Sequence, residues 1–514
     1  MTIKTWTYLI IVLFVAAFLR FYKLSSVPPS VDWDEAAIGW NAKTIFHTRL
    51  DEYGTKLPLA FRSFGDYKAP VYIYLTSPLV GILGMNELSV RLVSILAGIG
   101  SIVIIFFLTE AILENVQMIS VATKHQVALL SSLLLAVTPW HILLSRPAFE
   151  PNLALFFILL GTWWLVLGIK KHPVWLPPAT LSFVLSLYTY HSPKIFVPLF
   201  LLGMAFIYRE QLFEKKRIFL VAAAIILGIV TLFPLEQSLF FAEGGSRFQG
   251  TSVFFTKEGK RTLFDLNLVF QLGKNYAIHY SPKFLFGGAQ ENPRIQMREI
   301  GPLLLIEAPF LILGLLFLFN KRKEKWAQFL GWWFIVGPVA ATVGMEVPHP
   351  IRAFNLLPAL TIIVALGISQ SLKLCNWRFL KTTIALLFTV NLGYFLSCYF
   401  VAYPIYAAPD WQYGYKEVAK LAKSYEDQVD KIIVTSTYGQ PHTFMLFYQN
   451  RDPQQVFWGG MIKYLYRDLN WDEDQNLKNV LLVGSPKEIP TEAKGLVKEI
   501  KFPNGEVAFR IIKT

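Results

Sequence analysis

The sequence predicts a mainly α-helical protein that crosses a membrane many times and ends in a small α/β domain. Of its 514 residues, 54% are hydrophobic and only 16% are charged, and the mean hydropathy is +0.44. Apolar runs long enough to span a bilayer recur between residues 1 and 401. Soluble proteins are usually more polar than this, so membrane-spanning helices are expected to account for most of the chain.

Eleven apolar stretches are predicted to span the membrane, and together they form a domain over residues 1–401. The first follows only Lys4 and has no small-residue cleavage site after it, so we expect it to be retained rather than removed as a signal peptide. The predicted spans lie near residues 5–22, 88–110, 126–145, 151–169, 174–190, 194–208, 217–236, 301–319, 326–344, 353–371 and 380–401.

Basic clusters between these spans predict the orientation, because cytoplasmic loops are rich in Lys and Arg. With a cytoplasmic N-terminus, four clusters fall on the inner side, whereas Arg20 and Lys23 argue weakly against this orientation. The net charge of +13 is then a topology signal rather than a sign of nucleic-acid binding. The inner clusters are Lys170 and Lys171; Arg209 with Lys215, Lys216 and Arg217; Lys321, Arg322, Lys323 and Lys325; and Lys373, Arg378 and Lys381.

One apolar run, from Val71 to Leu83, is not counted as a span. Counting it would move all four basic clusters to the outer side of the membrane. We therefore expect a re-entrant or interfacial helix on the outer face.

Residues 402–514 differ in composition and are predicted to form an extracytoplasmic α/β domain. Alternating segments at 431–435, 479–483 and 507–512 predict strands, and helical patterns near 412–424 and 440–449 lie between them. This domain has no Gly-rich nucleotide fingerprint, so we expect it to support the site or to face the acceptor.

Three carboxylates lie close together in the first outer loop, residues 23–87: Asp32, Asp34 and Glu35. An ionisable group at the membrane boundary is costly unless it faces a polar cavity, so this cluster indicates a functional site. Asp34 or Glu35 could accept the proton of an acceptor hydroxyl or amine. The structural alternative is that these acids cap a helix over residues 35–45.

If the reaction releases a phosphate group, cations are needed to stabilise its negative charge. Basic side chains that could do so occur in the same set of outer loops. Lys68 precedes the interfacial helix, Arg91 follows it, and His349 and Arg352 lie before the tenth span. The planar guanidinium of an arginine can bind two phosphate oxygens at once, so Arg352 is the stronger candidate for phosphate binding. Lys68 would act as a single point charge. Each of these residues also has a structural alternative. Lys68 could extend its ammonium group to the lipid headgroups, Arg352 could anchor the start of a span in anionic lipid, and Arg91 could pair with Glu87.

Further polar residues are candidates for acceptor or supporting contacts. Asp66 lies two residues before Lys68, and Arg146 and Glu150 follow the third span. The spacing of Arg146 and Glu150 also fits a structural pair. Three histidines are interpreted as hydrogen-bonded interfacial residues rather than metal ligands: His141, His191 and His279.

Five short motifs together resemble the GT-C glycosyltransferases, over roughly residues 1–400. Among these, the chain is most similar to the protein O-mannosyltransferase and aminoarabinose-transferase branch. The motifs are Asp34-Glu35; Asp66-Tyr67-Lys68-Ala69-Pro70; Gly84 to Leu92; Ser145-Arg146 with Glu150; and His349-Pro350-Ile351-Arg352.

The resemblance implies an inverting membrane transferase that takes a monosaccharide from a polyprenyl phosphate and works on the outer face. It implies that Asp34 is the general base, with Glu35 its neighbour, and that Lys68 and Arg352 contact the donor phosphate. Ala69 stands where the family usually has proline, and Glu150 where aspartate is frequent. Glu150 is therefore left as an acceptor contact or a metal ligand. Clustered carboxylates could hold a divalent cation, but the spacing of the acidic residues in this sequence does not require one.

The acceptor is left open between a protein, a lipid and a glycan, and two other functions stay open. A ligase or polymerase of lipid-linked glycans would use a long outer loop such as residues 237–300, which contains Arg247, Lys257, Lys260, Arg261 and Arg294. A membrane transporter would show inverted repeats and polar or broken helices at the midplane, and the sequence displays neither.

Overall fold

The computed structural model describes residues 3–64, 66–114, 116, 120–239, 252–255, 265–374 and 378–514. The chain folds into two compact units, each built from three stretches of sequence. Unit 1 consists of Met1–Tyr22, Asp66–Val71 and Ser94–Leu396, and unit 2 of Lys23–Gly65, Tyr72–Val93 and Ser397–Thr514.

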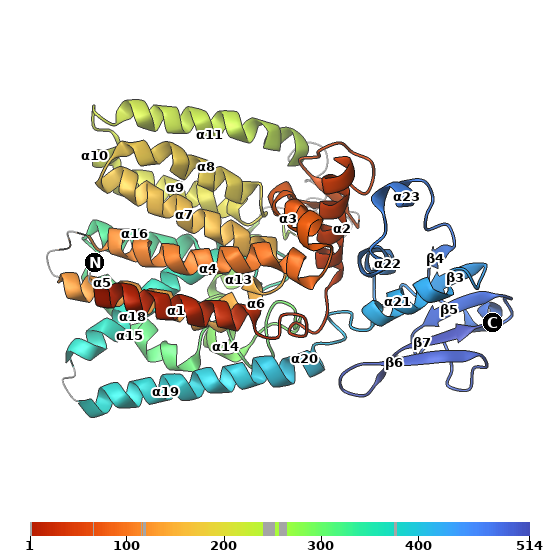
Figure 1. Cartoon of the computed structure of the whole chain (residues 1–514). Helices are drawn as coiled ribbons and strands as arrows, with labels where there is room; N and C mark the ends of the chain where they lie inside the picture. Colours follow the sequence, from red (N-terminus) through yellow and green to blue (C-terminus); the bar gives the residue numbers. More distant parts are fainter. Residues whose placement is uncertain are drawn as a thin grey trace. The chain divides into compact units, whose positions relative to one another are not determined.

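Unit 1 is a bundle of apolar helices, most of which run alongside one another in Figure 1. Its elements are α1 (Ile3–Phe21), β2 (Asp66–Lys68), α4 (Glu87–Ile112, whose first residues belong to unit 2), α5 (Val121–Val137), α6 (Pro139–Ser145), α7 (Glu150–Lys170), α8 (Leu176–Leu187), α9 (Pro193–Ile207), α10 (Arg209–Leu212), α11 (Ile218–Leu239), α13 (Leu266–Ile278), α14 (Pro282–Gly287), α15 (Ala308–Asn320), α16 (Lys325–Val336), α17 (Val339–Thr342), α18 (Leu357–Leu374) and α19 (Arg378–Ser397).

Each of the eleven predicted spans coincides with helix in the described part of the chain. Among the described residues, five helical segments are long and apolar enough to cross a bilayer alone: Ile3–Phe21, Glu87–Ile112, Glu150–Lys170, Phe354–Lys373 and Lys381–Tyr406. The third predicted span is a pair, α5 and α6, bent by 57°. The bend falls at Pro139, which has no N–H to continue the helix. Four of the remaining predicted spans coincide with shorter apolar helices, Pro173–Leu187, Pro193–Ile207, Ile218–Pro234 and Leu305–Asn320. The span at 326–344 coincides with α16 and α17.

Two of these helices, α15 and α18, approach each other closely because each has a glycine at the crossing. A Cβ added to Gly314 would lie 2.0 Å from the carbonyl oxygen of Ile363, and one added to Gly367 would lie 1.9 Å from that of Phe310. Small residues let helix backbones approach in this way in membranes. The crossing therefore fixes how these two helices pack.

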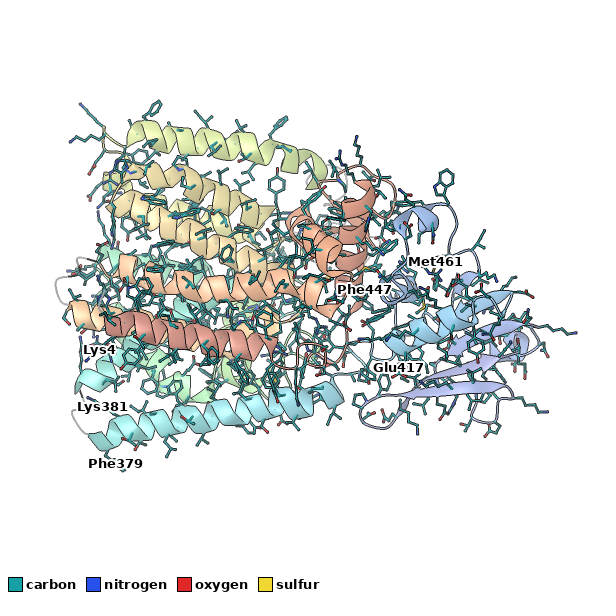
Figure 2. All side chains as sticks on the ribbon, in the orientation of Figure 1. Lys4, Phe379, Lys381, Glu417, Phe447 and Met461 are labelled. Atoms are coloured by element: carbon teal, nitrogen blue, oxygen red, sulfur yellow. The ribbon has the colours of Figure 1, made fainter. Side chains whose placement is uncertain are left out.

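The starts of α1 and α19 lie at the same end of the bundle, which agrees with an odd number of membrane crossings from α1 to α19. Lys4, near the start of α1, and Lys381, near the start of α19, lie at the same end of unit 1 in Figure 2. The uncounted apolar run forms α3 (Pro70–Leu83), a helix of 14 residues. At 1.5 Å per residue its length is about 21 Å, less than the ~30 Å hydrocarbon core.

Unit 2 combines the first outer loop with the C-terminal part of the chain. The loop contributes α2 (Trp33–Thr48), β1 (Phe61–Ser63) and most of α3. The last stretch of this unit starts at Ser397, and the predicted division into domains 1–401 and 402–514 stays a prediction. The C-terminal elements are α20 (Tyr403–Tyr406), α21 (Tyr415–Tyr425), β3 (Lys431–Val434), α22 (Pro441–Gln449), α23 (Pro453–Phe457), β4 (Tyr464–Tyr466), α24 (Trp471–Asp474), β5 (Val480–Gly484), β6 (Leu496–Lys501) and β7 (Val507–Lys513).

The C-terminal strands form one mixed sheet in the order β4-β3-β5-β7-β6 (Figure 1). β3 runs parallel to β4 and β5, and β7 runs antiparallel to β5 and β6. Ile433, Leu482 and Ile512 are buried together in its core. The predicted α/β pattern of this region is confirmed, and its strands at 431–435, 479–483 and 507–512 are present.

Candidate active site

The acidic turn of the first outer loop is the start of α2. The carboxylate of Asp32 accepts the Glu35 N–H at 2.8 Å, and the Glu35 carboxylate accepts the Asp32 N–H at 3.4 Å. This reciprocal arrangement is a capping box, which satisfies amides that a helix N-terminus leaves unpaired. The structural alternative, capping by Asp34 and Glu35, is realised for Glu35, whose capping partner is Asp32.

Glu35 also forms an ion pair with Arg91 in the interior of unit 2. Arg91 Nε donates to Glu35 Oε1 at 2.8 Å and Nη2 donates to Glu35 Oε2 at 2.7 Å, and both side chains are 0% exposed. The guanidinium also donates to the carbonyls of Leu24 and Ser30, each at 2.7 Å. Arg91 therefore ties α4 to the acidic turn and the loop before it.

This geometry changes the assignment of Arg91. The sequence suggested donor-phosphate binding or pairing with Glu87, but Arg91 is occupied by Glu35 and two carbonyls. Glu87 pairs instead with Lys416, at 2.6 Å between Nζ and Oε1. A buried guanidinium that makes these bonds has few donors left for a phosphate, so we assign Arg91 to holding the turn.

Asp34 differs from its acidic neighbours because its side chain is partly exposed. Asp32 is 1% exposed and Glu35 is 0% exposed, whereas Asp34 is of intermediate exposure in the first turn of α2. Of the two candidates for the general base, Asp34 is the one that a substrate can approach without breaking the capping box or the ion pair. This favours Asp34 over Glu35.

The C-terminal part of unit 2 supports α2 directly. The side-chain carbonyl of Gln412 accepts the N–H of Trp33, the first residue of α2, at 3.2 Å. α22 packs against α2, and Phe447, labelled in Figure 2, lies so close to Gly39 that an added Cβ would be 2.5 Å from its ring. The acidic turn is thus held by α4 and by the C-terminal region together.

The basic turn lies in unit 1, in the connection between α17 and α18. His349 is largely buried, and its Nδ1 accepts the Arg352 N–H at 3.3 Å. In the neutral ring, Nε2 then carries the hydrogen and can donate to an anion, and the Glu346 carboxylate of the same turn lies 4.0 Å from it. The Arg352 side chain is half-buried beside Gly344, where an added Cβ would lie 2.2 Å from Nη1. The turn thus offers two donors of the kind that phosphate binding requires.

Lys68 ends β2 in unit 1, and its side chain is largely buried. A buried ammonium group is stable only when it is paired or faces a polar cavity. The backbone of Asp66 belongs to the same strand, whereas its side chain lies outside the described residues. Phosphate binding by Lys68 and an acceptor contact by Asp66 stay predictions.

Arg146 contacts the end of α1, and its pairing with Glu150 stays a prediction. Its guanidinium is fully buried and donates to the carbonyls of Leu19 and Tyr22, at the end of α1. A cation at a helix C-terminus satisfies carbonyls that have no partner within the helix. Arg146 is therefore assigned to anchoring α1, while Glu150 begins α7 with a half-buried side chain.

A buried polar pair next to this anchor was missed by the sequence reasoning. Arg20 is fully buried, and its Nη2 lies 2.7 Å from His141 Nδ1 while Nη1 donates to the carbonyls of Ala16 and Ala136. The available signal in the sequence is a charged residue at the end of the first apolar run, which also bears on the topology. His141 is indeed hydrogen-bonded, as expected.

In the described ranges no group of three or more His, Cys, Asp and Glu side chains gathers where it could hold a metal ion. The acidic turn belongs to unit 2, and Lys68, His349 and Arg352 belong to unit 1. Their convergence in one pocket stays a prediction.

Solved structures with the same fold cover nearly the whole chain. ArnT from Cupriavidus metallidurans in the apo state has a TM-score of 0.53 at 12% identity, over 99% of this chain and 97% of ArnT. The same ArnT bound to undecaprenyl phosphate has a TM-score of 0.52 at 13% identity, over 99% and 97%. The Archaeoglobus fulgidus oligosaccharyltransferase tethered to an acceptor peptide has a TM-score of 0.52 at 13% identity, over 98% and 74%.

This protein is therefore a multi-pass membrane protein with the fold of the GT-C glycosyltransferases, and the predicted fold class and resemblance are confirmed. Within that class, residues 67–233 match the family model described as dolichyl-phosphate-mannose-protein mannosyltransferase. No curated protein matched the chain.

Proposed function

We propose that this protein is an inverting glycosyltransferase that moves a monosaccharide from a polyprenyl phosphate to an acceptor outside the cytoplasm. The acceptor is a hydroxyl or amine of a protein, lipid or glycan. In this proposal the N-terminus is cytoplasmic, the C-terminal domain is extracytoplasmic, and the protein resides in the cell membrane.

Asp34 takes the proton from the acceptor nucleophile in the proposed reaction. The nucleophile attacks the anomeric carbon from the face opposite the phosphate, so the new C–O bond forms as the bond to the phosphate oxygen breaks. The departing polyprenyl phosphate gains negative charge, which Lys68, His349 and Arg352 stabilise. Attack from the opposite face inverts the anomeric configuration.

The observation that carries this proposal is the differing environment of the three acids in one turn. Asp32 and Glu35 are buried in the capping box, and Glu35 also pairs with Arg91, so Asp34 sits on a rigid support and is itself of intermediate exposure. A general base needs both a fixed position and access to the proton it removes.

The comparisons support the donor class. The ArnT structure that shares this fold was obtained with undecaprenyl phosphate bound, and the matching family model carries a dolichyl-phosphate-mannose description. The chain covers 97% of ArnT but 74% of the archaeal oligosaccharyltransferase.

The test is sugar transfer by the purified full-length protein, supplied with synthetic polyprenyl-phosphate monosaccharides and an envelope extract as acceptor. We expect Asp34→Asn to lower turnover about 10²–10⁴-fold, the range typical of a lost general base. Asp427→Asn, an exposed acid of unit 2 beyond α21, is the matched control and should keep full turnover. Full turnover by a folded Asp34→Asn protein would remove Asp34 from the mechanism.

Transfer of an oligosaccharide from a lipid pyrophosphate is the second candidate. The archaeal oligosaccharyltransferase matches this chain with a TM-score of 0.52, close to the 0.53 of ArnT in the apo state. Of the long loop that would serve it, Arg294 is described, whereas Arg247, Lys257, Lys260 and Arg261 lie outside the described residues. Offering both donors to the same preparation separates the two functions. Vesicle uptake of the donor without transfer would favour the transporter alternative.

Metal dependence belongs to the same experiment. Loss of transfer in a chelator, restored by one divalent cation, would assign the reaction a metal ion. Unchanged transfer in the chelator would leave the acid–base mechanism without one.

A further inference from the structure

The segment between α17 and the basic turn is held by the long outer loop. Asn275, on α13, donates from its side-chain amide to the carbonyl of Thr342 at 3.1 Å. His279, the residue that follows the last residue of α13, accepts the backbone N–H of His349 on Nε2 at 3.2 Å. One helix of the loop thus contacts the segment near both of its ends.

Other residues of the loop hold the middle of the segment. Gln290 donates from its side-chain amide to the carbonyl of Pro348 at 2.9 Å, and its own N–H is fixed by Gln296 at 3.0 Å. Val253 N–H donates to the carbonyl of Val343 at 3.0 Å. These bonds leave the backbone before His349 little freedom to move.

The ring of His279 is itself fixed in one orientation. Its Nδ1 lies 2.8 Å from the carbonyl of Asn275, so Nδ1 carries the hydrogen and Nε2 keeps its lone pair for His349. The ring is fully buried and contacts the edge of Phe284. Burial lowers the pKa of His279 to about 4, which keeps the ring neutral and Nε2 an acceptor at physiological pH.

We propose that His279 is a positioning residue for the basic turn, and that α13 acts as a brace that fixes where His349 and Arg352 present their donors. The assignment of a polyprenyl phosphate as the ligand of this turn rests on the proposed function. The bracing itself rests only on the bonds to Thr342, Pro348 and His349. It gives the long outer loop a task other than binding a glycan chain.

Two variants of His279 separate the hydrogen bond from the bulk of the side chain. In His279→Gln, the amide oxygen can occupy the position of Nε2 and accept the His349 N–H. In His279→Leu, the side chain stays large and buried but accepts nothing. His172→Leu, at an exposed histidine, is the matched control.

Two readouts on the full-length protein test the brace. The first is amide hydrogen exchange of the peptide that contains His349, which needs no activity. We expect exchange about tenfold faster in His279→Leu, the effect of one lost hydrogen bond, and near the wild-type rate in His279→Gln. The second is the KM for the polyprenyl-phosphate sugar, which should rise in His279→Leu with little change in kcat and recover in His279→Gln.

The outcomes distinguish this inference from the proposed function. Wild-type exchange in a folded His279→Leu protein would overturn the brace. Faster exchange with an unchanged donor KM would uphold the brace and overturn its link to the donor. An absence of transfer by the wild-type protein would count against the proposed function, while the exchange readout would still decide the brace.

Discussion

Asp34 is separated from its two acidic neighbours by its surroundings rather than by its residue type. Asp32 and Glu35 have their oxygens engaged with backbone amides, and Glu35 also holds Arg91. Because those side chains are buried and bonded, their substitution is expected to disturb the turn before it affects any proton transfer. Substitutions of Asp34, whose exposure is intermediate, are expected to lower turnover.

Breaking the Glu35–Arg91 pair should cost stability. Arg91→Met leaves the Glu35 carboxylate buried without its cation, which typically costs about 3–5 kcal/mol. Lys416→Met is the control, because it breaks the Glu87 pair, whose lysine side chain is 45% exposed, and such pairs are worth about 0–1 kcal/mol. Thermal unfolding of the two detergent-purified variants makes the comparison. Equal, small losses in both would contradict the structural role of Arg91.

A small residue next to the basic turn offers a test of Arg352. In Gly344→Ala, the added Cβ would lie 2.2 Å from Arg352 Nη1, and the guanidinium, the far end of a flexible side chain, can move away. The variant should fold normally and raise the KM for the donor. Gly287→Ala, where an added Cβ meets no described atom within 4 Å, should leave KM unchanged. A wild-type KM in Gly344→Ala would argue against a donor contact by Arg352.

Single residues also show where sequence reasoning reaches its limit. The capping role of the acids was predictable, because capping depends on neighbours within one helical turn. The pairing of Glu35 with Arg91 was not, since many basic residues were available and only tertiary packing selects one. For the same reason the buried contacts of Arg20 and Arg146 with the ends of helices were not foreseen.

At the scale of elements, the crossing of α15 and α18 depends on two glycines. Gly367→Ala would bring a Cβ within 1.9 Å of the backbone oxygen of Phe310, which can move only if the helices separate. We expect a loss of about 1–3 kcal/mol, as for other overpacked sites. Gly393→Ala on α19, with open space around the added Cβ, should be tolerated. Unfolding in detergent compares them, and equal stability would contradict the close crossing.

Elements with a strong periodic pattern were predictable, and those without one were not. The apolar runs predicted all the helices of the spans, and alternation predicted β3, β5 and β7. Two strands of the same sheet were missed: β4 has only three residues, and β6 has its buried position at Ile500 among charged neighbours. Both lie at an edge of the sheet, where one side needs no partner strand and the pattern is weaker.

At the scale of the whole molecule, the proposed topology makes a direct prediction about labelling from outside the cell. In a protein whose Cys375 and Cys398 are replaced by serine, the substitution Asp427→Cys places a cysteine in the C-terminal region. This cysteine should react with a maleimide that cannot cross the membrane. A cysteine at Lys323, between α15 and α16, should react only after the membrane is permeabilised. Labelling of Lys323→Cys in intact cells would reverse the orientation inferred from the basic clusters.

The acidic turn and the basic turn belong to separate compact units, and local sequence patterns do not encode how such units pack. Each turn can be understood alone: the acidic turn from its cap and ion pair, and the basic turn from its brace. Whether one donor molecule reaches both depends on the packing between units, which local patterns do not encode.

The most direct test of the central claim is an experimental structure of the full-length protein with a non-hydrolysable polyprenyl-phosphate sugar bound. We predict that the donor phosphate lies within hydrogen-bond distance, about 2.7–3.2 Å, of Arg352, and that the Asp34 carboxylate faces the anomeric carbon from the side opposite the phosphate. A donor bound away from Arg352, or an Asp34 carboxylate on the far side of the protein from the sugar, would contradict the account.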